Sequence, residues 1–264
     1  MNIAVCIKQV PASESKIKLQ PDGMDIDWNG LSYVVNPYDE FAVEEGLRIK
    51  EGLGTGQVTV LTLGPQKAVE ALRTCLAMGA DQAIHVKDPR LEGGDAYATA
   101  VVLTAALRRE AYDLILFGKQ AIDDDNGAVG IHVAEMMGLP HVAVVNKLTL
   151  VPAERRALSH RQIEGAIELI ETTLPAIFTC QKGLNEPRYA SLPGIMKAKQ
   201  KPLTTLTIGD LSLSPDQVGR SGAKRSLVRM ELPAIRASGK VAQGTLDEAV
   251  QELVRFLREE VKVP

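Results

Sequence analysis

Short apolar runs alternate with amphipathic stretches over the first part of the chain. The runs have the length of buried strands and predict them at Ile3–Ile7, Val58–Leu63, Ala83–Val86, Leu114–Phe117 and Val142–Val145. Helical spacing between them predicts helices over 37–50, 66–78, 95–109 and 126–137. Strands that alternate with helices predict an α/β fold with a doubly wound, mostly parallel sheet of the Rossmann or flavodoxin type.

Beyond Val145 the pattern changes. Leu148–Val151, Ile167–Glu171 and Ala176–Thr179 predict strands separated by turns, and these strands extend or edge the sheet. The stretch 183–196 has no period but carries apolar side chains among polar residues and prolines. Apolar side chains on an irregular loop indicate a surface that meets a partner.

The C-terminal part shows weak signals until a final helix. From 197 to 240 it is rich in Ser, Gly and basic residues, and such a long irregular segment either wraps another surface or is mobile. Thr245 and Glu248 then form a capping box ahead of apolar residues at helical spacing. We expect an α/β nucleotide-binding domain over 1–196, with a partner-docking loop at 183–197, and an arm with its terminal helix over 197–264.

Two predicted helices begin with recognisable caps directly after strands. Asn36 precedes Pro37 at the first helical position, and Asn126 precedes the helix that ends near Met137. Ligands of open parallel sheets bind at the carboxyl ends of the strands, where helix N-termini favour phosphate. The loop Gly118–Gly127 is therefore the leading candidate for a nucleotide site.

Three consecutive acids lie in that loop. Asp123, Asp124 and Asp125 would repel a phosphate, so ribose hydroxyls are better partners for them. The alternative is a solvated loop whose charges favour the following helix N-terminus. The spacing leaves both interpretations open.

Composition and charge exclude several classes of protein. The 264 residues are 45% hydrophobic with a net charge of −3 and only 4% aromatic, so neither charge nor a stacking surface favours nucleic acid. Cys6, Cys75 and Cys180 are odd in number and widely spaced, which fits a reducing cytoplasm better than a disulfide framework or a zinc site. The longest apolar stretch is too short to span a bilayer, so no membrane insertion is expected.

No catalytic constellation is evident. The four histidines are scattered without metal-ligand spacing, and the pair His132 and Glu135 is interpreted as incidental. Nucleophile-elbow, phosphate-loop and dinucleotide glycine motifs are absent from the sequence. The residues alone therefore indicate a nucleotide-binding α/β domain with a partner-binding tail.

The chain resembles the β subunit of electron transfer flavoproteins almost from end to end. The motifs that carry the resemblance are Gly118–Asp125, Leu184–Ala190, Leu192–Pro193, Val35–Pro37, Ala42–Glu45, Ala77–Asp81, Leu174–Ala176 and Ile195–Lys199. The resemblance implies a heterodimer whose α subunit holds most of a redox-active FAD, while the β subunit holds a second adenine nucleotide. It implies an electron carrier that turns over no substrate of its own.

The same resemblance implies partners. Electrons would come from flavin dehydrogenases of the acyl-CoA dehydrogenase type, in fatty acid oxidation, and pass to the respiratory chain through the electron-transfer flavoprotein–quinone oxidoreductase. The arm would embrace the α subunit. The docking loop is expected at Arg188, Tyr189, Leu192, Pro193, Ile195, Met196 and Lys197. Leu192 would be the apolar anchor, and the alternative for Leu192 is ordinary packing within its own domain.

Carried over residue by residue, the nucleotide site falls on the strand ends that the hydrophobic pattern selects. Its expected members are Cys6, Asn36, Pro37, Tyr38, Asp39, Leu63, Gly118, Lys119, Gln120, Ala121, Ile122, Asp123, Asp124, Asp125, Asn126, Gly127, Ala128 and Val129.

One departure from the family pattern concerns the nucleotide itself. AMP-binding members carry Asn-Gln-Thr-Gly where this chain has Gly127–Gly130, so side chains that hydrogen-bond near the phosphate are absent. Tyr38–Asp39, Val129–Gly130 and Ala134–Glu135 resemble instead the electron-bifurcating branch, whose β subunit holds a second FAD that exchanges hydride with NADH. Asp124 is the AMP-type residue. AMP and a second FAD both stay open, with FAD favoured.

A nucleotide-binding module that acts alone is the alternative class of protein. A free-standing adenine-nucleotide sensor of the related α/β hydrolase-like kind would have no redox role and would need no partner. Such a module should lack the stretch Asn185–Arg188, which this chain has.

Overall fold

A single nine-stranded sheet organises the first two hundred or so residues in the computed structural model, which describes residues 1–234, 239, 241–242 and 244–262. The strands from β11 to β7 run parallel, and β8 and β9 extend the sheet in antiparallel fashion. In sheet order they are β11 (Leu203–Leu206), β5 (Gln82–Val86), β4 (Gln57–Leu63), β1 (Asn2–Cys6), β6 (Leu114–Gly118), β10 (Ala176–Cys180), β7 (His141–Val151), β8 (Arg156–Ile163) and β9 (Ala166–Thr173). The predicted doubly wound, mostly parallel α/β sheet is confirmed.

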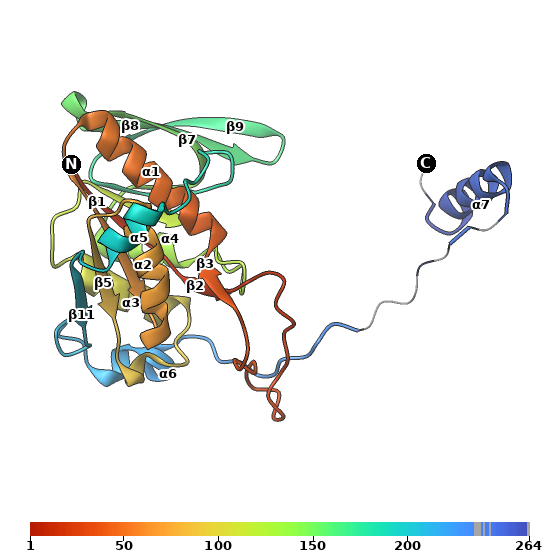
Figure 1. Cartoon of the computed structure of the whole chain (residues 1–264), viewed down its shortest axis with the longest axis horizontal. Helices are drawn as coiled ribbons and strands as arrows, with labels where there is room; N and C mark the ends of the chain where they lie inside the picture. Colours follow the sequence, from red (N-terminus) through yellow and green to blue (C-terminus); the bar gives the residue numbers. More distant parts are fainter. Residues whose placement is uncertain (235–238, 240, 243, 263–264) are drawn as a thin grey trace.

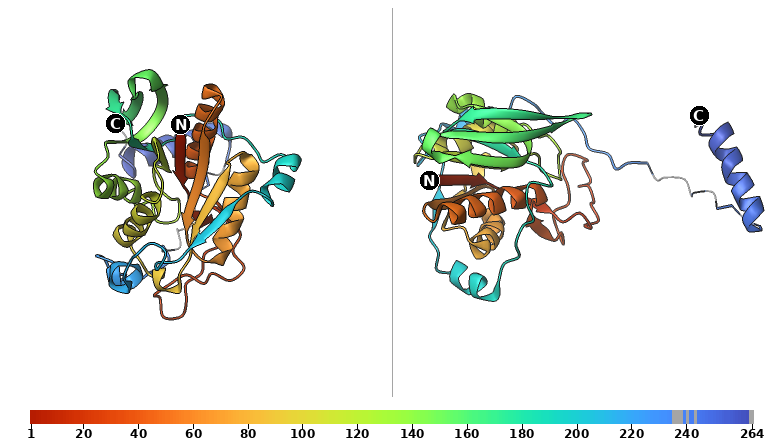
Figure 2. Two further views of the ribbon diagram at one scale, coloured as in Figure 1. Left: turned by 90° about the vertical axis from the view of Figure 1, so that its left-hand side faces the viewer. Right: turned by 90° about the horizontal axis from the view of Figure 1, so that it is seen from above.

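Helices cover both faces of the sheet (Figures 1 and 2). One face carries α1 (Pro37–Leu53), α2 (Val69–Met78) and α5 (Leu192–Ala198), and the other carries α3 (Ala96–Leu107), α4 (Val129–Met137) and α6 (Gly219–Gly222). Short helical turns η1 (Gln66–Ala68), η2 (Pro89–Leu91), η3 (Pro152–Glu154) and η4 (Pro215–Gln217) join these elements.

Strand β1 shows why the central strands of the sheet are continuous apolar runs in the sequence. Ile3 and Val5 belong to the core under α1 and α2, whereas Ala4 and Cys6 belong to the core under α3 and α4. Each face of the strand is therefore buried, and burying an aliphatic side chain fully contributes about 1.5–3 kcal/mol. This two-sided burial places β1 at the centre of the sheet, next to β4 and β6.

A small second sheet lies beside the carboxyl end of β1. Strand β2 (Gln9–Pro11) pairs with β3 (Tyr33–Val35) in antiparallel fashion. Between them the expected hairpin region holds one isolated bridge, from Leu19 to Ile26. The chain returns in this way to Asn36, at the start of α1.

Several strand predictions need correction. β10 is inserted between β6 and β7, so the stretch 176–180 lies inside the parallel sheet and not at its edge. The predicted strands 142–145 and 148–151 are one strand, β7, with an irregularity at Val145 and a positive φ at Val144. β8 was missed because its inward positions include the small residues Ala157 and Ser159, which make no apolar run.

The chain after Lys197 differs from the predicted arm. β11 pairs with β5, and Ile208, Leu211 and Val218 are buried in the core under α3, so residues up to about 223 pack on the α/β domain. Sequence patterns missed this segment because its apolar residues are isolated and its strand has four residues. The predicted arm also includes 235–238 and 240, which lie outside the described residues.

The predicted terminal helix is present as α7 (Leu246–Glu259), with the capping box of Thr245 and Glu248. It lies apart from the sheet in Figure 1. Five of its apolar residues are exposed: Leu246, Val250, Leu253, Val254 and Leu257. Among the described helices, none combines the length and the apolar character needed to cross a membrane.

Candidate functional site

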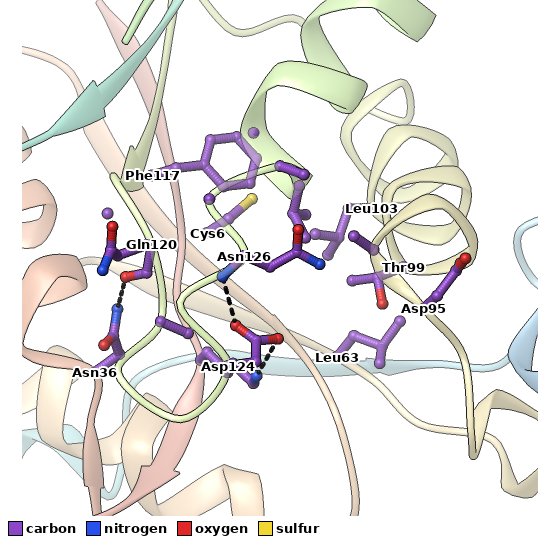
Figure 3. Close-up of a pocket in the computed structure, with 18 of the residues that line it drawn as sticks. Cys6, Asn36, Leu63, Asp95, Thr99, Leu103, Phe117, Gln120, Asp124 and Asn126 are labelled. Atoms are coloured by element: carbon purple, nitrogen blue, oxygen red, sulfur yellow. Dashed lines mark hydrogen bonds and ion pairs between the residues drawn. The ribbon is translucent and has the colours of Figure 1, made fainter. Parts of the chain in front are cut away.

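A pocket of about 760 Å³ opens at the carboxyl edge of the sheet, where β1, β4 and β6 end. The loop that follows β6 forms one wall, and the N-terminal part of α3 forms the opposite wall (Figure 3). Cys6, Leu63 and Phe117 supply apolar surface from the three strand ends. Pockets of this size and mixed lining are typical of small-molecule sites.

Asn36 holds the loop after β6 in place. It is 1% exposed, and its side-chain N–H donates to the carbonyl of Gln120 at 2.9 Å, while its side-chain oxygen accepts from the N–H of Ile122 at 3.1 Å. The predicted side-chain cap of α1 is therefore wrong, because the amide group is used across the loop and makes no cap bond. Asn36 joins the start of α1 to the wall of the pocket.

Asp39 makes a second junction, one turn further along α1. Its carboxylate accepts from the backbone N–H of Lys8 at 2.7 Å and of Gly118 at 3.0 Å. A Cβ at position 118 would lie 2.3 Å from Asp39 Oδ1, so this close approach requires glycine. Burial raises the pKa of Asp39 to about 7, although the two N–H donors act in the opposite direction.

The three consecutive acids have separate environments. Lys8 Nζ lies 2.8 Å from Asp123 Oδ1 and 3.4 Å from Asp124 Oδ2, and Asp125 Oδ1 accepts from Gln120 at 2.6 Å. Of the three, only Asp124 lines the pocket, where it also accepts from the N–H of Asn126. Asp124 is therefore the one placed to meet a ligand hydroxyl, whereas Asp123 and Asp125 stabilise the loop.

The N-terminus of α4 closes one end of the pocket. The helix begins at Val129, after an Ala128 cap that makes no side-chain bond, so the predicted start at Asn126 is wrong and the predicted end at Met137 is confirmed. Gly127 has a φ of +63° and Gly130 packs against Phe117, so the backbone can approach a ligand closely. The uncapped N–H groups of this helix favour an anionic group such as phosphate.

The opposite wall was not predicted. It comes from the start of α3 and from the chain after α6, and its residues are Gly93, Gly94, Asp95, Ala96, Thr99, Leu103, Arg225, Ser226 and Leu227. Asp95 ties the two segments together, since Oδ1 accepts from Ala98 N at 2.9 Å and Oδ2 accepts from the N–H groups of Lys224 and Arg225. Asp95 is the first residue of the predicted helix 95–109 and caps α3 in the structure, but nothing local marks the later segment.

Most of the expected nucleotide-site residues are brought together by the fold. Those that line the pocket are Cys6, Asn36, Asp39, Leu63, Gly118, Lys119, Gln120, Ala121, Asp124, Asn126, Gly127, Ala128 and Val129. Those that lie outside its lining are Pro37, Tyr38, Ile122, Asp123 and Asp125. Ile7, Lys8, Phe117 and Gly130 line the pocket in addition to the residues carried over from the family.

The expected docking loop lies against α1 at its base and against α2 at Gly194. The sequence predicts an irregular loop here, but part of it is the short helix α5. Ser191 caps this helix, since its Oγ accepts from the N–H of Gly194 at 3.1 Å. Tyr189 is 98% exposed and Leu192 is 79% exposed, and Pro193, Ile195, Met196 and Lys197 are exposed as well. The alternative that Leu192 packs within its own domain therefore does not hold. Arg188 points inward, against α1.

Metal-ligating side chains do not gather in the described part of the chain. No group of three or more His, Cys, Asp or Glu there has metal-binding geometry. Cys6 lines the pocket, but burial raises the pKa of its thiol, which therefore stays protonated and is a poor nucleophile. The pocket has the features of a binding site.

Comparisons with known proteins agree with this geometry. Residues 24–211 match the family model described as "Electron transfer flavoprotein domain". The chain is 40% identical over 264 residues to the electron transfer flavoprotein subunit beta of Bacillus subtilis (strain 168), covering 100% of both chains. It is 36% identical over 261 residues to the corresponding subunit of Methylophilus methylotrophus, covering 98% of each chain.

A third relative is named as part of a larger assembly. The caffeyl-CoA reductase–Etf complex subunit CarD of Acetobacterium woodii is 38% identical over 261 residues, covering 98% of each chain. Proteins of this family act in electron transfer, associate with flavin, and pair a β subunit with an α subunit. On the strength of these full-length matches, the chain belongs to the electron transfer flavoprotein family, among its β subunits.

Proposed function

We propose that this β subunit binds an adenine nucleotide in the pocket at the ends of β1, β4 and β6, within a heterodimer whose α subunit holds the redox-active FAD. The observation that carries the proposal is the convergence of three features on one cavity. They are the uncapped N-terminus of α4 for a phosphate, Asp124 for a ribose hydroxyl, and the apolar side chains of Leu63 and Phe117 for a base.

The proposed nucleotide is a second FAD in preference to AMP. Gly127, Ala128 and Val129 offer no side-chain donor to a terminal phosphate, which would then rely on backbone N–H groups. The pocket also continues past α4 to Thr99 and Arg225, which leaves room for a diphosphate and more beyond it. One feature favours AMP instead. Asp124 is the residue of AMP-type members, and its side chain narrows the loop after β6.

Asp39 does not help to decide between the two nucleotides. The resemblance to the bifurcating branch predicts that Asp39 meets NADH or a second flavin, but both of its carboxylate oxygens accept backbone N–H groups. Its role is to fix the strand ends. NADH-dependent electron bifurcation therefore rests on the missing phosphate donors and on the extended pocket.

The test is the identity of the nucleotides in heterodimer purified with its α subunit and supplied with excess FAD. Absorption and mass spectrometry of the released nucleotides, together with NADH reduction of the intact protein, give the answer. Two flavins per heterodimer and reduction by NADH are expected. One flavin, one tightly held AMP and no response to NADH would contradict the choice of FAD and leave the adenine-nucleotide site intact.

The proposed electron donors are flavin dehydrogenases of the acyl-CoA dehydrogenase type, which dock on the exposed loop around Leu192. The acceptor proposed for the carrier is the electron-transfer flavoprotein–quinone oxidoreductase. The relative named as a subunit of a caffeyl-CoA reductase complex supports a partner that acts on CoA thioesters. The exposed apolar side chains of α5 support docking through that helix.

The family assignment favours this function over a free-standing nucleotide sensor. A sensor would need no partner, whereas the exposed apolar face of α7 needs a surface to cover it. We assign that surface to the α subunit, with α7 and the chain before it packing on the partner. Size-exclusion chromatography with and without the α subunit separates the two classes of protein.

A further inference from the structure

The docking loop is tied to α1 by an arginine that turns away from the loop's exposed tip. Arg188 Nε and Nη2 donate to the two carboxylate oxygens of Glu44 at 2.8 and 3.0 Å. Nη1 and Nη2 donate to the two oxygens of Glu51 at 2.6 and 2.9 Å. One guanidinium therefore makes paired hydrogen bonds to two carboxylates, which is the geometry that favours Arg over Lys.

The two carboxylates lie on one face of α1, seven residues apart, and differ in burial. Glu44 is 4% exposed, so its charge needs a partner close by, whereas the Glu51 side chain is 56% exposed. The backbone N–H of Arg188 also donates to Glu44, at 3.2 Å. Four of the five N–H donors of the guanidinium are engaged within the chain, which leaves little of Arg188 for a partner protein.

A second tie lies three residues earlier. Asn185 Nδ2 donates to the carbonyl of Phe41 at 3.0 Å and to Glu45 Oε2 at 2.9 Å. The base of the docking loop is thus fixed to α1 at two points, while Tyr189 and Leu192 at its tip are exposed. A loop that is already held in one conformation loses less conformational entropy when a partner binds.

We propose that Arg188 is a positioning residue, which orients the docking loop through Glu44 and Glu51 and does not itself contact the dehydrogenase. The inference rests on the proposed docking function and changes the role expected for Arg188. The docking loop and the nucleotide pocket then share one support, because Asp39 of α1 and Asn36 directly before it hold the pocket wall.

The test measures kcat and KM of an acyl-CoA dehydrogenase while the concentration of the heterodimer, its electron acceptor, is varied. Arg188→Lys keeps the charge but loses the paired bonds, so we expect KM for the carrier to rise about tenfold with little change in kcat. Glu51→Gln alters an exposed side chain and leaves the buried Glu44 paired; it should raise KM in the same direction by a smaller factor. The double variant should show less than the product of the two single effects. Arg48→Lys, at an exposed arginine of the same helix, is the matched control and should change nothing.

Each other outcome overturns the inference in an identifiable way. If Arg188→Lys raises KM while Glu51→Gln leaves KM unchanged or lowers it, Arg188 touches the dehydrogenase directly. If Arg188→Lys lowers Tm and flavin content but not KM, its role is only structural. If Leu192→Ala raises KM and neither Arg188→Lys nor Glu51→Gln does so, docking on this loop stands and the positioning role fails. A wild-type heterodimer that accepts no electrons from any acyl-CoA dehydrogenase would overturn the docking proposal and this inference together.

Discussion

Two side chains at the start of α1 connect the ends of β1 and β6 to the pocket wall. Asn36 holds the backbone of Gln120 and Ile122, and Asp39 holds the backbone N–H groups of Lys8 and Gly118. Both are buried polar groups with their hydrogen bonds made, so removing either leaves backbone groups unsatisfied. The precise shape of the pocket wall depends on these two residues.

Asp39 predicts a pH dependence of stability. Its pKa is raised from 3.8 to about 7 because of burial, so the folded protein retains the proton more tightly than the unfolded chain. The stability that this group contributes is complete below about pH 4 and is lost as the pH rises towards 7. An Asn at this position has no such dependence, and it can accept only one of the two N–H groups, at a cost of about 1–3 kcal/mol.

The measurement is the Tm of the heterodimer with and without Asp39→Asn, between about pH 5 and about pH 8. The wild type should melt higher throughout, and its advantage should shrink as the pH rises. A difference in Tm that stays constant or widens with pH would show that Asp39 is ionised in the folded protein across this range.

Leu192 gives a second prediction at the residue scale. Leu192→Ala should slow electron transfer from an acyl-CoA dehydrogenase about fivefold or more, since truncating an apolar anchor costs more than about 1 kcal/mol. Flavin content and Tm should not change, because the side chain is exposed. Leu169→Ala on β9, at a leucine that is 75% exposed, is the matched control. If both variants slow electron transfer equally, or if Leu192→Ala alone loses flavin, Leu192 is not part of the docking surface.

At the scale of elements, helix α5 sits against α2 through a glycine. A Cβ on Gly194 would lie 2.3 Å from the carbonyl oxygen of Ala77, so the contact requires glycine. The other end of α5 is held by Arg73, which donates to the carbonyls of Ala198 and Lys201. The pose of the docking helix therefore depends on α2 as well as on α1.

Gly194→Ala should push α5 off α2, raise KM for the heterodimer as a dehydrogenase substrate, and lower Tm. Gly52→Ala in α1 is the control, because a Cβ there meets nothing within 4 Å and gains about 0.5–1 kcal/mol of helix propensity. KM can be measured with the same assay as for Arg188. If Gly194→Ala and Gly52→Ala give the same KM and Tm, the close contact has no functional role.

Elements with a strong local pattern were predictable, and elements that depend on distant partners were not. β1, β4, β6 and the helices that cover them are long or fully apolar, so their own residues identify them. β11 has four residues and is a strand because β5 offers a free edge. The pocket shows the same difference. Its strand-end wall follows from the parallel sheet, whereas Arg225–Leu227 form part of the opposite wall through long-range contacts such as the hydrogen bonds to Asp95.

At the scale of the whole molecule, the heterodimer should protect the C-terminal chain. After the pocket wall at Arg225–Leu227, the chain carries the exposed apolar side chains of Val228 and Leu232, and several apolar side chains of α7 are exposed too. Limited proteolysis should cut the isolated β subunit within this part and leave the bulk of the α/β domain intact. In the complex with the α subunit the same sites should resist. Equal protection, or equal cleavage, in both samples would contradict the proposed packing on the α subunit.

The central claim is that the pocket of this subunit holds an adenine nucleotide in addition to the FAD of the α subunit. The most direct test counts the adenine nucleotides released from wild-type heterodimer and from Asn36→Ala heterodimer. Asn36→Ala removes two hydrogen bonds that hold the loop after β6, worth about 0.5–1.5 kcal/mol each. We predict two adenine nucleotides per wild-type heterodimer and a specific loss of one in the variant. A wild type with a single nucleotide, or a variant that retains both with unchanged affinity, would contradict the account.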